Sequence, residues 1–151
     1  MNKPLILFMT PTLVLCILSA HLSIAINTTD SLKHKVFLVV KDVLPDSYED
    51  YVMFKAPANG LYNDSFLKKV GGLEGDFVWR DGRTYYVNDN PIGKAKQQSK
   101  KGEPAEMGSM GVLPEGKYFV YSNHEDSYDS RYKKIDWVDK SDVIGVAYPI
   151  F

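Results

Sequence analysis

The sequence predicts a mainly β domain that follows an apolar N-terminal segment. Short runs rich in β-branched and aromatic residues alternate with turns of Gly, Pro, Asn or Asp, which is typical of strands. The one apolar run of helical length lies at the N-terminus, and 151 residues with 44% hydrophobic content suit one compact domain. The polar stretch 89–116 predicts a long connection between strands. The predicted strands are residues 36–40, 51–54, 66–70, 77–79, 84–87, 118–121 and 143–148.

Composition excludes several classes of site. A net charge of -1 and the absence of a long basic block argue against a dedicated nucleic-acid binder. The single cysteine, Cys16, excludes an internal disulfide framework and a thiolate metal cluster. His21, His34 and His124 are scattered and show no metal-ligand spacing. We therefore expect no metal site and no cofactor.

The N-terminal segment predicts a membrane span. Residues 4–26 are apolar over roughly the twenty residues that a bilayer-spanning helix needs, and Lys3 precedes them. Small residues near the end of the run also permit a cleaved export signal, but the run is longer than the apolar core of most such signals, so an anchor is favoured. We expect residues 1–27 to form the anchor or signal and 28–151 the β domain, with the helix ending shortly before Ser31.

Two adjacent lysines lie in one of the predicted strands. The stretch from Phe66 to Asp76 is apolar, contains Lys68 and Lys69, and ends in a glycine-rich turn. Burial against apolar neighbours lowers the pKa of a lysine, and the neutral amine is then a proton acceptor. A lysine pair that only protects a sheet edge is the alternative. Because neighbouring side chains on a strand point to opposite faces, we expect Lys68 to be buried near Ser127 and Lys69 to face solvent or a carboxylate.

The stretch 121–132 is dense in side chains that form local hydrogen bonds, which alone is consistent with a polar loop. Its pattern resembles the carboxy-terminal signature of type I signal peptidases, in which Gly-Asp-Asn precedes Ser-x-Asp-Ser-Arg. The stretch 66–76 resembles the lysine box of the same family, and the catalytic lysine aligns with Lys68. The residues that match the carboxy-terminal signature are Asn123, Ser127, Asp129, Ser130, Arg131 and Tyr132.

The stretch from Asn27 to Leu32 resembles the serine box, particularly as it occurs in TraF-like conjugative-transfer peptidases, and makes Ser31 the candidate nucleophile. The resemblance covers almost the whole chain, and its specificity comes from ordered boxes at compatible spacing. The chain departs from the family pattern at three places. Tyr121-Ser122 and Glu49-Asp50 each replace Gly-Asp, and Ser31 is followed by Leu32-Lys33.

The resemblance implies a signal-peptidase-like antiparallel β-sheet domain with one N-terminal transmembrane helix. It further implies that neutral Lys68 activates Ser31 and that the hydroxyl of Ser127 orients the lysine, although Ser127 could instead cap a turn. The oxyanion hole would be formed by the backbone N–H of Ser31 and the hydroxyl of Thr29, which could also be a plain loop residue.

The remaining implied roles concern support and specificity. Asp129 and Arg131 match positions that form a supporting ion pair. Leu32, Phe66 and Leu67 are candidates to line substrate pockets, and a role in the core is equally consistent with their type. Substrates would be exported precursor proteins, such as a pilin precursor, cut after small residues at the bacterial inner membrane with the catalytic domain on the periplasmic side. A catalytically inactive scaffold subunit of a secretion or conjugation apparatus is the alternative.

Overall fold

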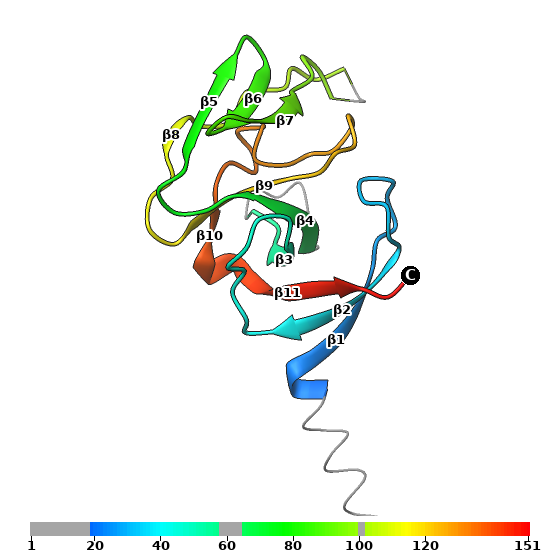
Figure 1. The fold of residues 1–151 in the computed structure, drawn as a ribbon. Coiled ribbons are helices and arrows are strands. Elements are labelled where there is room, and N and C mark those ends of the chain that lie inside the picture. The colour runs from blue at the N-terminus through cyan, green and yellow to red at the C-terminus, as the bar shows by residue number, and fades with distance from the viewer. Residues whose placement is uncertain (1–18, 58–64, 100–101) are drawn as a thin grey trace, which may run out of the picture.

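The computed structural model of the protein describes residues 19–57, 65–99 and 102–151. These residues form two antiparallel sheets, shown in Figure 1. The larger sheet has seven strands in the order β1-β2-β11-β3-β4-β9-β10, and the smaller has four in the order β7-β6-β5-β8. The elements are β1 (Leu22–Ile26), β2 (Val36–Lys41), β3 (Tyr51–Lys55), β4 (Ser65–Gly72), β5 (Phe77–Asp81), β6 (Thr84–Val87), β7 (Asn90–Lys94), β8 (Gly111–Val112), β9 (Lys117–Tyr121), β10 (Val138–Asp139), the 3₁₀ helix η1 (Lys140–Asp142) and β11 (Val143–Pro149).

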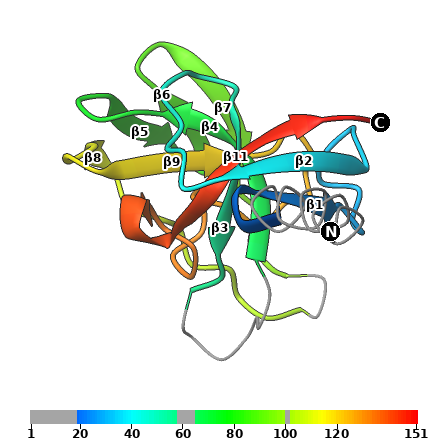
Figure 2. The same cartoon turned by 90° about the horizontal axis from the view of Figure 1, so that it is seen from below.

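The last strand, β11, lies between β2 and β3 in the larger sheet, so the C-terminal part of the chain joins the N-terminal strands (Figure 2). The pairing of β11 with β3 shifts register between Val143 and Gly145. A Cβ atom at Gly145 would collide with the backbone of Val40 on β2. Glycine is therefore required there by the close approach of the two strands.

Strand β9 separates two apolar clusters. Phe119 and Tyr121 pack in the cluster beneath the smaller sheet, whereas Tyr118 and Val120 pack on the opposite face of β9, with apolar residues of β3 and β4. This follows from the alternation of side chains along a strand. Because four of its five residues are buried, β9 is a rigid base for the polar segment that follows it.

The prediction of a mainly β antiparallel domain is confirmed, and each of the seven predicted strands is present. The structure adds four strands that were not predicted: β1, β7, β8 and β10. Two of these, β7 and β8, lie within the stretch 89–116 that was expected to be only a connection. Pro91 and Gly93 give β7 a poor strand propensity, so its pairing with β6 depends on the neighbouring strand rather than on its own sequence.

The prediction of an N-terminal helix that continues to shortly before Ser31 is wrong at its carboxyl end. Residues 19–21 are helical, but Leu22–Ile26 form β1, which pairs with β2 in regular register. The edge of β2 supplies backbone partners for a run whose apolar residues suit a strand as well as a helix. Within the described residues, no helix is long and apolar enough to span a bilayer. Residues 4–18 of the predicted span lie outside the described part of the chain.

Candidate active site

Lys68 lies in the middle of β4, between β3 and β9, and its side chain is buried, with 5% of the residue exposed. Its Nζ donates a hydrogen bond to Ser127 Oγ at 3.0 Å. Burial lowers the pKa of Lys68 to about 8; the carboxylate of Asp129 opposes this shift and the guanidinium of Arg131 adds to it. About a tenth of the Lys68 side chains are therefore neutral at pH 7, and only the neutral amine can act as a general base.

Lys69 points the other way. Its Nζ lies 2.6 Å from Glu49 Oε2 and 5.6 Å from the centre of the Tyr51 ring. The expectation that Lys68 is the buried lysine and contacts Ser127, while Lys69 faces a carboxylate, is confirmed. The reason is the alternation of side chains along β4.

Ser31 lies in the loop between β1 and β2. Ser31 Oγ is 2.8 Å from Thr29 Oγ1, and the backbone N–H of Ser31 donates to the same oxygen at 3.4 Å. The amide of Asn27 holds this loop by donating to the carbonyls of Leu32 and His34, at 3.2 Å each. The structure thus brings Thr29 and Ser31 together.

Ser31 and Lys68 are linked through the segment after β9. Among the described residues, no hydrogen bond joins Ser31 Oγ directly to Lys68 Nζ. Instead, Ser122 donates its hydroxyl hydrogen to the carbonyl of Ser31, and the amide of Ser122 donates to Asp129 Oδ2 at 3.2 Å. The register that pairs Lys69 with Tyr121 leaves Ser122 at the level of Lys68. The loop that contains Ser31 is therefore held at the end of β9, next to the part of β4 that contains Lys68.

Asp129 and Arg131 form a buried, bidentate ion pair. Arg131 Nε lies 2.8 Å from Asp129 Oδ1 and Nη2 lies 2.8 Å from Oδ2, with the two side chains 3% and 0% exposed. Arg131 also donates to the carbonyls of Ser122 and Lys94, at 3.3 and 3.4 Å. This contact between Asp129 and Arg131 was predicted. The pair has the bidentate geometry that is strongest for a guanidinium and a carboxylate, and the hydrogen bond from Arg131 to Lys94 joins the segment after β9 to β7.

The three residues predicted to line substrate pockets fall into two groups. Leu32 is buried in a cluster with residues of β2 and β11, and Leu67 packs against that cluster. Phe66 lies on the opposite face of β4, where its ring stacks on Phe54 with centroids 5.8 Å apart. The structure brings Leu32 and Leu67 together and places Phe66 elsewhere, on the face that also carries Lys68.

Sequence reasoning missed the contacts of Ser122, Tyr121 and Glu49. Ser122 bonds to the backbone of the candidate nucleophile, and Tyr121 donates a hydrogen bond to Glu49. The only signal in the sequence was that these positions depart from the family pattern. A difference from the family pattern does not indicate which residue the new side chain contacts.

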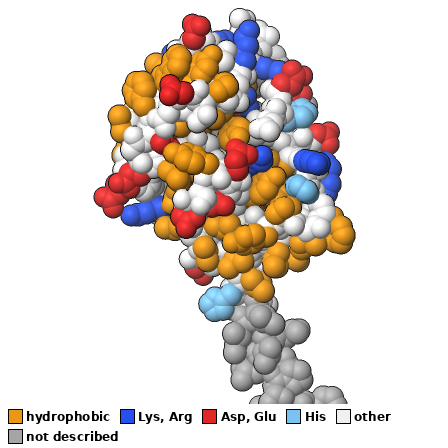
Figure 3. All heavy atoms as spheres, in the orientation of Figure 1, with side chains coloured by type: hydrophobic (Ala, Val, Ile, Leu, Met, Phe, Trp, Pro, Cys, Tyr) orange, Lys and Arg blue, Asp and Glu red, His pale blue; other side chains and the backbone are white. Residues whose placement is uncertain are grey.

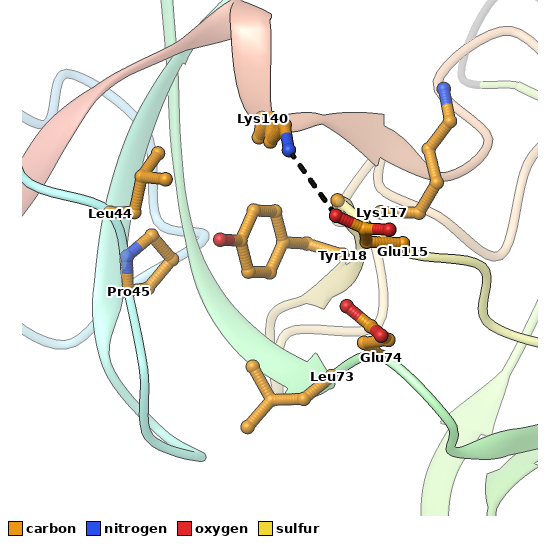
Figure 4. Close-up of a pocket in the computed structure, with 9 residues that line it drawn as sticks. Leu44, Pro45, Leu73, Glu74, Glu115, Lys117, Tyr118 and Lys140 are labelled. Carbon is orange, nitrogen blue, oxygen red and sulfur yellow. Dashed lines mark ion pairs between the residues drawn. The ribbon is translucent and has the colours of Figure 1, made fainter.

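A pocket of about 310 Å³ lies elsewhere (Figure 4). The ring of Tyr118 stands in it between the apolar Leu44 and Pro45 and the ion pair of Lys140 with Glu115. None of the predicted site residues lines this pocket. In the described part of the chain, no group of three or more His, Cys, Asp or Glu side chains is placed to hold a metal ion.

A buried lysine of lowered pKa beside a serine-rich polar segment, in an antiparallel β domain, is the arrangement expected of a serine peptidase with a lysine base. In a comparison with known proteins, residues 4–151 match the family described as signal peptidase, peptidase S26. The chain belongs to this family, whose members are serine peptidases that act on precursor proteins.

Among solved structures, the chain is similar to a signal peptidase I from Enterococcus faecalis V583. The two are 26% identical, and the match covers 70% of this chain and 98% of the other, with a TM-score of 0.45. No curated protein sequence matches the chain significantly.

Proposed function

We propose that the protein is a membrane-anchored serine endopeptidase that cleaves exported precursor proteins after small residues, with Ser31 as nucleophile and Lys68 as general base. One observation carries the proposal: Lys68 is buried, hydrogen-bonded to Ser127 at 3.0 Å, and has its pKa lowered to about 8. A surface lysine would be protonated and unable to accept a proton at neutral pH.

In the proposed reaction, neutral Lys68 takes the proton of the Ser31 hydroxyl while Ser31 Oγ attacks the carbonyl carbon of the scissile peptide. The Thr29 hydroxyl and the Ser31 N–H stabilise the oxyanion. Lys68 then gives its proton to the leaving amine, and a water molecule, deprotonated by Lys68, hydrolyses the acyl-enzyme. Because Ser31 Oγ bonds to Thr29 Oγ1 in the substrate-free state, its side chain must turn toward Lys68 when substrate binds.

The contacts support the other predicted roles. Ser127 orients the amine of Lys68, and the ion pair of Asp129 with Arg131 holds the segment that carries Ser127. Leu32 and Leu67 on one side and Phe66 on the other would contact the substrate residues next to the cut. Because Leu32 is buried and Leu67 and Phe66 are partly buried in apolar clusters, such pockets would be shallow, consistent with small residues before the cut.

The proposed location is the bacterial inner membrane, with residues 1–27 as anchor and the peptidase domain, 28–151, on the periplasmic side. Hydrophobic side chains gather over the lower part of the domain in Figure 3. Strand β1 and the residues after β11 carry exposed apolar side chains: Ile24, Ile26, Ile150 and Phe151. An apolar surface at this end of the domain is consistent with a position next to lipid.

The serine box supports a TraF-like role in conjugation, for which the substrate would be a pilin precursor. Candidate precursors are to be co-expressed with the full chain, and cleavage read as a mobility shift. Ser31→Ala should abolish cleavage, whereas Ser47→Ala, at an exposed serine in the loop between β2 and β3, should not. Cleavage by Ser31→Ala at the wild-type rate would contradict the proposal. Assembly of an apparatus that survives Ser31→Ala, with no precursor cut by the wild type, would favour the inactive scaffold.

A further inference from the structure

Ser122 occupies a position that couples the candidate nucleophile to the buried ion pair. It directly follows β9 and is completely buried. Its partner across the chain, Ser31, is 91 positions away in the sequence. Here the family pattern has an aspartate, so the contact is made by a residue in which this chain departs from its family.

Every polar group of Ser122 is engaged. Its amide donates to Asp129 Oδ2 at 3.2 Å, and its carbonyl accepts from Arg131 Nη2 at 3.3 Å. Its hydroxyl oxygen accepts from the backbone N–H of His124 at 3.3 Å. A serine hydroxyl has one hydrogen to donate, and here that hydrogen goes to the carbonyl of Ser31.

The carbonyl of Ser31 needs such an anchor because the loop of residues 27–35 has no regular secondary structure. The amide of Asn27 holds the carbonyls of Leu32 and His34, which lie on the far side of Ser31. The hydroxyl of Ser31 bonds within the loop, to Thr29. The distance from Ser31 to Lys68 therefore depends on where the backbone of Ser31 is held.

We propose that Ser122 is a positioning residue: it fixes the backbone of Ser31 to the segment that also carries Ser127, the partner of Lys68. Ser31 and Lys68 therefore both contact the segment that follows β9. The ion pair of Asp129 with Arg131 holds that segment in place. This rests on the proposed role of Ser31 as nucleophile. An error of about 1 Å in such a position lowers a rate by up to about 100-fold.

The test is steady-state kinetics of the full-length protein in detergent, with a fluorogenic peptide that spans the cleavage site of the precursor identified by co-expression. Ser122→Ala should lower kcat about 10- to 100-fold and leave KM within about twofold, because the carbonyl of Ser31 loses its donor. The pH profile should keep its shape, since the groups around Lys68 are unchanged. Activity should recover at least partly in Ser122→Thr or Ser122→Cys, which keep a donor.

Ser109→Ala is the matched control, because the Ser109 hydroxyl also donates to a single acceptor, Asp136 Oδ2 at 2.9 Å, but does not touch Ser31. It should leave kcat unchanged. A second readout needs no substrate: deuterium uptake in peptides that cover residues 27–35 should rise in Ser122→Ala and stay at the wild-type level in Ser109→Ala.

Unchanged kcat in Ser122→Ala, unchanged uptake over residues 27–35, or no recovery in either donor-retaining variant would each overturn the proposal. Ser31→Ala separates this inference from the proposed function. If Ser31→Ala remains active, the assignment of the nucleophile fails. If it is inactive while Ser122→Ala is fully active, only the positioning role fails.

Discussion

Tyr121 donates the hydrogen bond of its phenol to Glu49, across 72 positions of sequence. Glu49 has a φ of 68°, in the left-handed region that favours glycine, and its carboxylate also pairs with Lys69 at 2.6 Å. At both positions, 49 and 121, the resemblance leads one to expect glycine. The two departures thus contact each other, on the face of β4 opposite Lys68.

This contact predicts energetic coupling between the two side chains. In a double-mutant cycle with Glu49→Gln and Tyr121→Phe, the coupling should be about 0.5–1 kcal/mol, a modest value because the side chain of Glu49 is 55% exposed. Urea unfolding of the four proteins measures it. If the changes in the free energy of unfolding of the two single variants add up to that of the double variant within about 0.3 kcal/mol, the hydrogen bond contributes nothing to stability.

The two lysines of β4 should differ sharply in activity. Lys68→Met should abolish precursor cleavage because it removes the proposed base, whereas Lys69→Met removes only an ion pair at a carboxylate and should be tolerated. Initial rates of peptide cleavage measure both. Equal loss in the two variants, or loss only in Lys69→Met, would move the catalytic assignment by one residue.

Activity should rise with pH through the pKa of Lys68. Only the neutral amine accepts a proton, and burial lowers the pKa of Lys68 to about 8. We expect kcat/KM to increase about tenfold per pH unit well below 8 and to reach a plateau above it. Lys69→Met provides the control and should give the same profile. A rate that is flat between pH 6 and 9 would be incompatible with Lys68 as base.

Lys68 should also destabilise the fold at neutral pH. Its pKa is about 8 in the folded protein, against an ordinary lysine value of 10.5, so the unfolded chain binds more protons between these values and wild-type stability rises with pH there. Lys68→Met removes this cost. The free energy of unfolding of Lys68→Met should exceed that of the wild type by at most about 3 kcal/mol at pH 7, and this difference should be about 2 kcal/mol smaller at pH 10. Urea unfolding at both values tests this, and a difference independent of pH would contradict it.

Among the pairs in the site, that of Asp129 with Arg131 should lose the most folding stability when one partner is replaced. Arg131→Met leaves a buried carboxylate without its partner and should cost about 3–5 kcal/mol. The double change Asp129→Leu with Arg131→Met should cost less than the single change, since no charge then remains buried. Thermal or urea unfolding distinguishes these outcomes. A double variant less stable than Arg131→Met would show that packing, rather than charge, dominates at this pair.

Local patterns in the sequence predicted a large part of the fold and of the site. Alternating apolar residues locate β4 and its neighbours, because one face of each strand must be buried. The same alternation separates Lys68 from Lys69 before any contact is known. The ion pair of Asp129 with Arg131 was expected only from the resemblance of their segment to the carboxy-terminal signature of the family, and the structure forms it.

Only the tertiary structure decided the contacts between distant segments. The apolar residues Leu22–Ile26 suit a helix or a strand, and the free edge of β2 selects the strand. The hydrogen bond from Ser122 to Ser31 and that from Tyr121 to Glu49 join residues 91 and 72 positions apart. Periodicity states which face of an element is buried but not which partner covers it, because partners are selected by packing and backbone pairing across the whole domain.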